Sequence, residues 1–160
     1  MENVSGEGMR ATARIMAGPA LLGFLGGTAA IGVLGLLAKT TGLPLLIAPF
    51  GASCVLLFAV PESAFAHPRN MVFGHLIASA IGVGICAFAG IGLWQMAIAV
   101  GLAIAAMQLT RTVHPPAGAD PLVIMLAGGA SVKFLLLPVL AGVLCLFLIS
   151  RVFNYCFRAR

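Results

Sequence analysis

The sequence predicts an all-α polytopic membrane protein with about six hydrophobic segments arranged as two inverted repeats. Three observations predict this fold class. Of the 160 residues, 61% are apolar and only 8% are charged, whereas about a quarter of the residues are charged in soluble domains. The apolar residues also form runs close to the ~20 residues that a membrane-spanning helix needs. Finally, each half of the chain contains one hydrophobic run that proline and glycine interrupt.

The composition also excludes several classes of protein and site. So few charges cannot cover the surface of a soluble domain, and so apolar a chain is not intrinsically disordered. The basic residues are scattered, so we expect no nucleic-acid partner. The histidines show no metal-ligand spacing and no cofactor motif is present, so we expect neither metal nor cofactor. The spacing of Ser53, His75 and Asp120 does not call for catalysis, and we expect no enzyme.

The predicted organisation is a short tail followed by one transmembrane domain. Residues 1–16 are polar and are predicted to form a cytosolic N-terminal tail. Residues 17–157 form the transmembrane domain, in which repeat one covers 17–91 and repeat two covers 93–157.

Repeat one is predicted to contain a helix, a broken helix and a second helix. The first helix spans residues 17–38 and ends at a turn over 39–42. The second segment, 43–60, is interrupted at Pro49-Phe50-Gly51-Ala52-Ser53, and the third helix spans 71–91 after a loop. Proline and glycine at these positions are typical of helix breaks.

Repeat two shows the same order of elements. A helix over 96–110 leads into the break at residues 115–120. The apolar run that follows, 122–130, is too short to span a membrane alone and is predicted to be a half-helix. The last helix covers 134–153. Since each unit has three crossings, the second unit is predicted to be inverted, as in many transporters and channels.

The basic residues predict the orientation, because cytosolic loops carry an excess of lysine and arginine. With six crossings and a cytosolic N-terminus, both termini lie in the cytosol and the split is seven against two. The alternative of four crossings and two re-entrant loops gives five against four. In the preferred arrangement the cytosolic side holds Arg10, Arg14, Arg69, Arg111, Arg151, Arg158 and Arg160, and the other side holds Lys39 and Lys133.

Small residues four positions apart predict close helix packing. They serve contacts within one chain or between copies of a homo-oligomer, and the sequence leaves both open. The pairs are Gly23/Gly27, Ala78/Gly82 and Ala97/Gly101.

Several motifs carry a resemblance to a known family. His114-Pro115-Pro116-Ala117-Gly118-Ala119 resembles the signature of the HPP family of integral membrane proteins. Pro49–Ser53, Pro68-Arg69-Asn70 and Gly74-His75 resemble that family's pattern in the same order. The resemblance covers residues 17–153.

The resemblance implies a compact membrane-embedded protein. Plastid and cyanobacterial members of the family are linked to nitrite transport, and many bacterial members have no assigned substrate. The chain departs from the pattern at His67, where a glutamine is expected, and at Cys54, where a small apolar residue is common.

The two breaks also predict an anion site from physical chemistry alone. Half-helices that begin near Gly51–Ser53 and Gly118–Asp120 would enter from opposite faces of the membrane. Each N-terminus carries about half a positive charge, so two of them near the midplane suit a small anion. Ser53 adds a hydroxyl donor, and Asp120 is expected to cap its half-helix.

Five side chains in this prediction have two open interpretations each. The arginines Arg69 and Arg111 form either an electrostatic funnel or ordinary membrane anchors. His75 either shuttles a proton or bonds to a backbone carbonyl, and His114 either ties the break in place or lines the path. Asn70 either donates its amide N–H to the site or caps the third helix. The complete predicted site is Gly51, Ala52, Ser53, Arg69, Asn70, His75, Arg111, His114, Pro115, Pro116, Gly118 and Ala119.

The predicted function is membrane transport of a small inorganic anion, with nitrite favoured by the resemblance. Whether the protein is a channel or a carrier stays open. The expected partners are membrane lipids and the anion, and the expected location is a bacterial inner membrane. The alternative function is a non-transporting membrane scaffold or regulatory subunit, in which the broken helices are dry packing devices.

Overall fold

The structure is a computed structural model that describes residues 6–158, with the side chains described from Gly18 onward. Every regular element in this range is helical, which confirms the predicted all-α class. Three helices are long and apolar enough to cross a membrane: Gly18–Thr41, Pro68–Ala89 and Leu135–Arg158. The elements are α1 (Gly6–Thr41), α2 (Pro49–Phe58), η1 (Ala64–Ala66), α3 (Pro68–Ala89), α4 (Leu93–Leu109), η2 (Pro115–Ala119), α5 (Asp120–Leu126), η3 (Leu135–Leu140) and α6 (Ala141–Arg158).

The first helix is longer than predicted at both ends. Of the predicted tail, residues 1–5 lie outside the described residues, and α1 begins at Gly6 because the alanine-rich stretch that follows favours helix. The predicted turn at 39–42 is also wrong, since α1 continues to Thr41. The chain leaves the helix at Gly42, whose φ of 71° is a left-handed conformation that glycine adopts readily.

The break in the second segment lies earlier than predicted. Residues 43–48 are non-helical, and Pro49–Ser53 form the first turn and a half of α2 instead of interrupting it. The reason is that proline is favoured in the first turn of a helix, where its missing N–H costs nothing. In the second half, η2 precedes α5, which begins at Asp120 and has only 7 residues. The prediction of a short half-helix after the second break is therefore correct.

The third helix begins before its predicted start. α3 starts at Pro68, so Arg69 and Asn70 lie in its first turn. His67 is the N-cap residue, and its Nδ1 accepts a hydrogen bond from the Arg69 N–H at 3.3 Å. The interpretation of Asn70 as the cap is wrong, because its amide donates instead to the Ala64 carbonyl at 2.9 Å.

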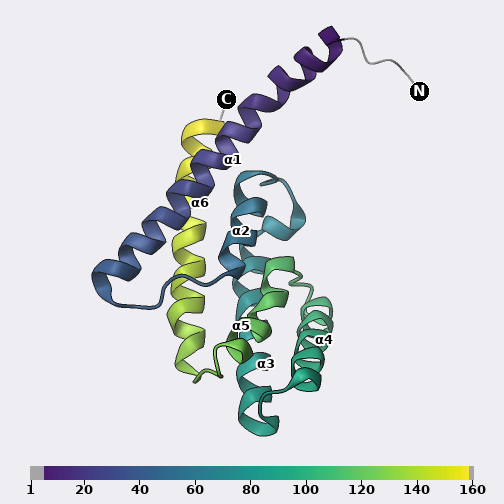
Figure 1. Ribbon diagram of the computed structural model, residues 1–160, viewed down its shortest axis with the longest axis vertical. Helices are drawn as coiled ribbons and strands as arrows, with labels where there is room; N and C mark the ends of the chain where they lie inside the picture. Colours follow the sequence, from purple (N-terminus) through teal and green to yellow (C-terminus); the bar gives the residue numbers. More distant parts are fainter. Residues whose placement is uncertain (1–5, 159–160) are drawn as a thin grey trace, which may run out of the picture.

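The third helix of each half packs against the first two elements of the other half. α3 contacts α4, η2 and α5, whereas α6 contacts α1 and α2. Figure 1 shows α6 beside α1 and α2, and α3 beside α4 and α5. Matching α1, α2 and α3 with α4, η2–α5 and α6 therefore maps one set of contacts onto the other.

The two half-helices point toward opposite ends of the molecule. The side chains of Asn154 and Arg158, near the end of α6, donate to carbonyls at the C-terminal end of α2. The chain just after α5 lies instead near the far end of α3, where a Cβ on Gly129 would be 3.8 Å from the Ile91 side chain. This opposite direction is what two inverted repeats require.

Two glycines make equivalent close contacts in the two halves. A Cβ on Gly74 of α3 would lie 3.1 Å from the carbonyl oxygen of Thr112 in the chain leading to η2. A Cβ on Gly142 of α6 would lie 3.1 Å from the carbonyl oxygen of Leu45 in the chain leading to α2. In each half, a glycine thus lets the third helix approach the extended backbone before a half-helix. The repeated contact supports the inverted-repeat arrangement.

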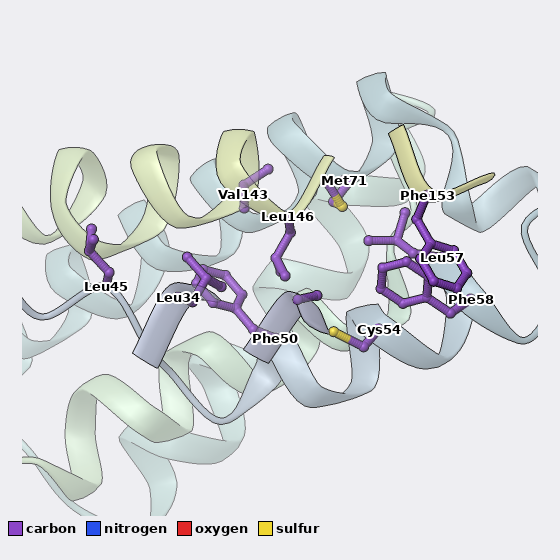
Figure 2. Close-up of a cluster of buried hydrophobic side chains, with 11 residues drawn as sticks. Leu34, Leu45, Phe50, Cys54, Leu57, Phe58, Met71, Val143, Leu146 and Phe153 are labelled. Atoms are coloured by element: carbon purple, nitrogen blue, oxygen red, sulfur yellow. The ribbon is translucent and has the colours of Figure 1, made fainter. Parts of the chain in front are cut away.

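The larger apolar core lies between α1, α2 and α6, with Met71 of α3 at its edge (Figure 2). Phe50 on α2 is fully buried and faces Gly142, where any side chain would meet its ring. The rings of Phe58 and Phe153 meet edge to face with centroids 5.4 Å apart. Because lipid is as apolar as these residues, close packing stabilises this core more than the hydrophobic effect does. A smaller cluster joins α3, α4 and η2 through Ala78, Ala103, Met107 and Ala117.

A pair of glycines on α3 tests this packing. In Gly82→Ala, the new methyl would lie 2.9 Å from the Pro121 Cα, so α3 and α5 would have to separate. In Gly84→Ala, nothing lies within 4 Å of the new methyl. Alanine favours helix over glycine by about 1 kcal/mol, whereas overpacking costs about 1–3 kcal/mol. We expect a lower melting temperature in detergent for Gly82→Ala and an unchanged or higher one for Gly84→Ala. Equal melting temperatures would contradict the α3–α5 contact.

Candidate functional site

A continuous chain of buried polar side chains lies where α2 and η2–α5 meet α3. Asp120 begins α5, His75 lies on α3, Ser53 lies on α2, and His114 directly precedes η2. All four side chains have no solvent exposure in this otherwise apolar interior. Polar groups at such depth are costly unless they are paired, so their convergence marks a candidate site.

The four side chains are joined by short contacts in one order. Asp120 Oδ2 lies 2.8 Å from His75 Nδ1, and His75 Nε2 lies 3.1 Å from Ser53 Oγ. Ser53 Oγ lies 2.9 Å from His114 Nε2, and His114 Nδ1 lies 2.8 Å from the Phe65 carbonyl oxygen. The chain therefore runs from α5, across α3 and α2, to the loop that precedes α3.

Further contacts hold the Asp120 end of this chain. The Ser79 hydroxyl donates to Asp120 Oδ2 at 2.9 Å. Ser79 is one helical turn after His75, so both side chains lie on the same face of α3. The other carboxylate oxygen, Asp120 Oδ1, is buried and has no hydrogen-bond partner. The edge of the Phe50 ring lies against the His75 ring with centroids 5.5 Å apart, which connects the site to the larger core.

The position of Asp120 corrects one prediction. Asp120 does not cap α5, since no side-chain capping bond is present there. Its carboxylate points instead to α3, where it accepts from His75 and Ser79. Among the side chains described, those of residues 18–158, the His75–Asp120 contact is the one pairing of a carboxylate with a lysine, arginine or histidine, and both of its side chains are fully buried. Removing one member of such a pair leaves the other polar group without compensation in an apolar interior.

Two glycines on α3 let the segments that carry His114 and Asp120 approach this helix closely. A Cβ on Gly74 would lie 2.8 Å from the His114 Cβ, so only glycine lets the backbone before η2 approach α3 at this level. A Cβ on Gly82 would lie 2.9 Å from the Pro121 Cα, directly after Asp120. The interpretation of His75 as bonded to a backbone carbonyl is wrong, because it bonds to Asp120 and Ser53. His114 does tie the segment before η2 in place, through Ser53 and the Phe65 carbonyl.

The remaining predicted residues near the breaks lie beside this row of buried polar side chains. An apolar groove of about 560 Å³ runs between α2 and η2. Gly51 is exposed and Gly118 half-buried, and a Cβ on either would meet nothing within 4 Å. The groove is lined by Ala48, Pro49, Ala52, Val55, Leu56, Pro115, Pro116 and Ala119.

The predicted basic residues lie apart from the buried chain. Arg69 is exposed, and its guanidinium donates to the Thr110 carbonyl at 3.2 Å. The start of α3 therefore lies beside the segment that follows α4. Arg111 is exposed and has a φ of 55°. Asn70 is half-buried and bonds to Ala64. None of these three side chains contacts Ser53, His75, His114 or Asp120 directly.

A polar cavity of about 580 Å³ lies at the C-terminal end of α2. There, Arg158 donates to the Phe58 carbonyl and Asn154 donates to the Leu57 carbonyl at 3.2 Å. A cation at this end complements the negative end of the helix dipole. The cavity also reaches both neighbours of Phe65, whose carbonyl holds His114. Its lining residues are Leu57, Pro61, Glu62, Ser63, Ala64, Ala66, His67, Pro68, Phe147, Ser150, Arg151, Asn154, Tyr155 and Arg158.

Sequence reasoning did not include Asp120, Ser79 or the Phe65 carbonyl in the site. One signal for Asp120 was present in the sequence. Pro49-Phe50-Gly51-Ala52-Ser53 and Pro116-Ala117-Gly118-Ala119-Asp120 share the pattern Pro-x-Gly-Ala followed by a polar residue. This repeat puts Ser53 and Asp120 at equivalent positions, and both contact the His75 ring in the structure.

Comparison with known proteins places this arrangement in a family. Two transmembrane proteins of Dictyostelium discoideum are 34% and 33% identical to the chain over 122 residues, which is 72% of its length. The chain spans less than half of these curated relatives, since the match covers 43% and 39% of them. No solved structure matches the chain.

The comparisons establish the family of the chain, whereas its predicted cellular location stays a prediction. The relatives are eukaryotic transmembrane proteins, so the bacterial inner membrane and the cytosolic termini stay predictions. The family model described as "HPP, transmembrane region" matches residues 12–160, nearly the whole chain. The match includes all four motifs on which the resemblance was based. The chain is therefore an integral membrane protein that belongs to the HPP transmembrane family.

Proposed function

We propose that the protein transports a small inorganic anion, with nitrite as the first substrate to test. One observation carries this proposal. Two oppositely directed half-helices both begin at the same row of buried polar side chains. Non-helical backbone at membrane depth is tolerated where it is buried in protein or lines a wet cavity. Paired broken helices that begin at a common site are characteristic of transporters built from inverted repeats.

The charge distribution gives the anion a route to this site. The polar cavity at the end of α2 is bordered by Arg151, Arg158 and one acidic residue, Glu62, so its lining carries a net positive charge, and basic clefts concentrate anions. We place this cavity on the cytosolic side, together with both ends of the chain. Its loop residues Ala64 and Ala66 flank Phe65, which binds His114. In this proposal the anion enters from the cavity and reaches the starts of α2 and η2.

We also propose that the protein is not an enzyme, although Ser53, His75 and Asp120 are joined in the order of a hydrolase triad. A nucleophilic serine needs a single base that takes its proton. The Ser53 hydroxyl is instead shared between His75 and His114.

Flux into liposomes tests the proposed function directly. Purified protein in sealed vesicles is given an inward gradient of nitrite, nitrate or chloride, and the internal anion is measured over time. We expect nitrite uptake above that of protein-free vesicles, which show the passive entry of the undissociated acid. If folded protein moves none of the three anions, the scaffold or regulatory function takes the place of transport.

The two exposed arginines near Thr110 provide a test of anion selectivity. Arg69→Gln together with Arg111→Gln should lower nitrite flux by roughly two- to tenfold at low salt, and less at high salt, because exposed charges attract anions through a screened field. Lys133 is exposed, follows α5, and is predicted to lie on the side of the membrane opposite Arg69 and Arg111. Lys133→Gln therefore serves as the control. Unchanged or increased flux in the double arginine variant would contradict attraction of an anion at this mouth.

A further inference from the structure

We propose that the chain Asp120–His75–Ser53–His114 holds one exchangeable proton and relays it between α5 and the loop before α3. This inference rests on the proposed function for its anion, and it adds that one proton crosses with each anion. The argument comes from counting donors and acceptors along the chain.

The two ends of the chain fix the positions of two protons. The Phe65 carbonyl only accepts hydrogen bonds, so His114 Nδ1, at 2.8 Å, must carry a proton. At the other end, an ionised Asp120 also only accepts. It receives one proton from the Ser79 hydroxyl and one from His75 Nδ1.

The middle of the chain then lacks one proton. If both histidines were neutral, the Nε2 atoms of His75 and His114 would both be bare acceptors. Ser53 has a single hydroxyl proton and lies within 3.1 Å and 2.9 Å of these two atoms. One of the two contacts would then contain no hydrogen. A single added proton satisfies both contacts, and it also balances the charge of Asp120, so the buried cluster becomes neutral overall.

With Asp120 ionised, the added proton has two arrangements that satisfy every contact. In the first, His75 carries protons on both nitrogens, its Nε2–H donates to Ser53, and the Ser53 hydroxyl donates to His114. In the second, His114 carries both protons, its Nε2–H donates to Ser53, and Ser53 donates to His75. Moving from the first to the second breaks the N–H bond at His75 Nε2 and the original O–H bond of Ser53. It forms a new O–H bond on Ser53 and an N–H bond at His114 Nε2, so protons and charge balance. A third arrangement places the added proton on Asp120 Oδ2, which donates to His75 Nδ1 while His75 Nε2–H donates to Ser53, and this one links the relay to α5.

The two ends of the relay lie next to different parts of the fold. Asp120 Oδ1 is buried without a partner and is a free acceptor at the α5 end. At the other end, Phe65 lies between two residues that line the polar cavity. The relay therefore leads from the oppositely directed half-helix α5 to His114, beside the cavity at the end of α2. There the Phe65 carbonyl only orients the ring, and the proton leaves when the His114 Nδ1–H bond breaks and a water molecule accepts that proton.

The groups around the relay leave its proton count unchanged. From α2 comes the buried thiol of Cys54, from α3 the hydroxyl of Ser79, and from the segment before η2 the hydroxyl of Thr112. The Thr112 hydroxyl pairs with that of Thr110 at 2.7 Å. The nearest arginines in the chain, Arg69 and Arg111, are exposed. η3, an element of the other half, is partly buried and packs beside α3. It contributes apolar residues and Pro138.

Vesicles that contain a pH-sensitive dye test the relay. With an inward nitrite gradient, wild-type protein should acidify the interior by one proton per nitrite beyond the passive entry measured in protein-free vesicles. An imposed potassium diffusion potential should leave the rate of this added uptake unchanged. Ser53→Ala removes the hydroxyl between the two histidines and should lower proton-coupled uptake at least tenfold. Cys54→Ala is the matched control, because Cys54 is the next residue of α2, is also buried, and packs in the larger apolar core outside the polar cavity.

The outcomes separate the relay from the proposed function. Nitrite uptake without acidification, and accelerated by a positive internal potential, would overturn the relay and leave anion transport intact. Equal coupling in Ser53→Ala and Cys54→Ala would also overturn it. No uptake by folded wild-type protein would overturn the proposed function itself. Ser53→Thr keeps a hydroxyl on α2, so restored coupling in this variant would support the relay over a packing role for Ser53.

Discussion

Replacing Asp120 by alanine is expected to lower the free energy of unfolding by about 3–5 kcal/mol, because it removes one partner of the buried, hydrogen-bonded Asp120–His75 pair. The variant leaves the donors of His75 and Ser79 without an acceptor in an apolar interior. Equilibrium unfolding in detergent, followed by circular dichroism, measures the effect. Asp120→Asn keeps one acceptor oxygen at the same place and should lose much less stability.

A double-mutant cycle separates this pair from general damage to the fold. Asp120→Leu and His75→Leu should each be destabilising, and the double variant should be less destabilised than their sum by about 1–3 kcal/mol. Such coupling is expected because each single variant leaves the other polar group buried and unpaired. Additive losses would show that the two side chains do not interact in the folded protein.

Replacing Phe50 by alanine is expected to cost about 3–5 kcal/mol, which is typical when a large buried aromatic side chain leaves a cavity. Phe50 is fully buried between Gly142 and the larger core, and its edge supports the His75 ring. The variant should therefore lower the melting temperature and also reduce nitrite flux. The same substitution at Phe88, which is 95% exposed, serves as the control and should leave both nearly unchanged. Similar losses in both variants would contradict this placement of the core.

The parts of the fold that were predictable from the sequence depend on composition and spacing. Apolar runs separated by short polar segments predict membrane helices, and the third and fourth helices lie within a few residues of their predicted bounds. Half-helix α5 was also predictable, because nine apolar residues after Asp-Pro cannot cross a membrane. The length of the first helix was missed because polar residues can continue a helix beyond the bilayer.

The exact position of the first break was missed for a different reason. Proline ends one segment and begins another with equal ease, so Pro49 marks a boundary without giving its direction. In the structure Pro49 starts α2, the chain before it is non-helical, and Phe50 packs against Gly142.

The candidate site was partly predictable. Ser53, His75 and His114 were identified because polar side chains within apolar segments usually face the protein interior. Their partner Asp120 was assigned to a helix cap, since an aspartate at the start of a helix usually has that role. Which polar groups meet depends on how α3 packs on α5, a contact that joins residues 45 positions apart. Spacing along the chain carries no information on that contact.

Water access to Ser53 tests the central claim most directly, because a transport site must hydrate and a dry packing device must not. The four native cysteines are replaced, and a single cysteine is placed at Ser53 or at Ala103, both fully buried. In membranes, a small water-soluble thiol reagent should label the cysteine at position 53, and nitrite should slow the labelling. The cysteine at position 103 should stay unlabelled. If both positions are equally inert in folded protein, the half-helices meet in a dry core and the transport account is contradicted.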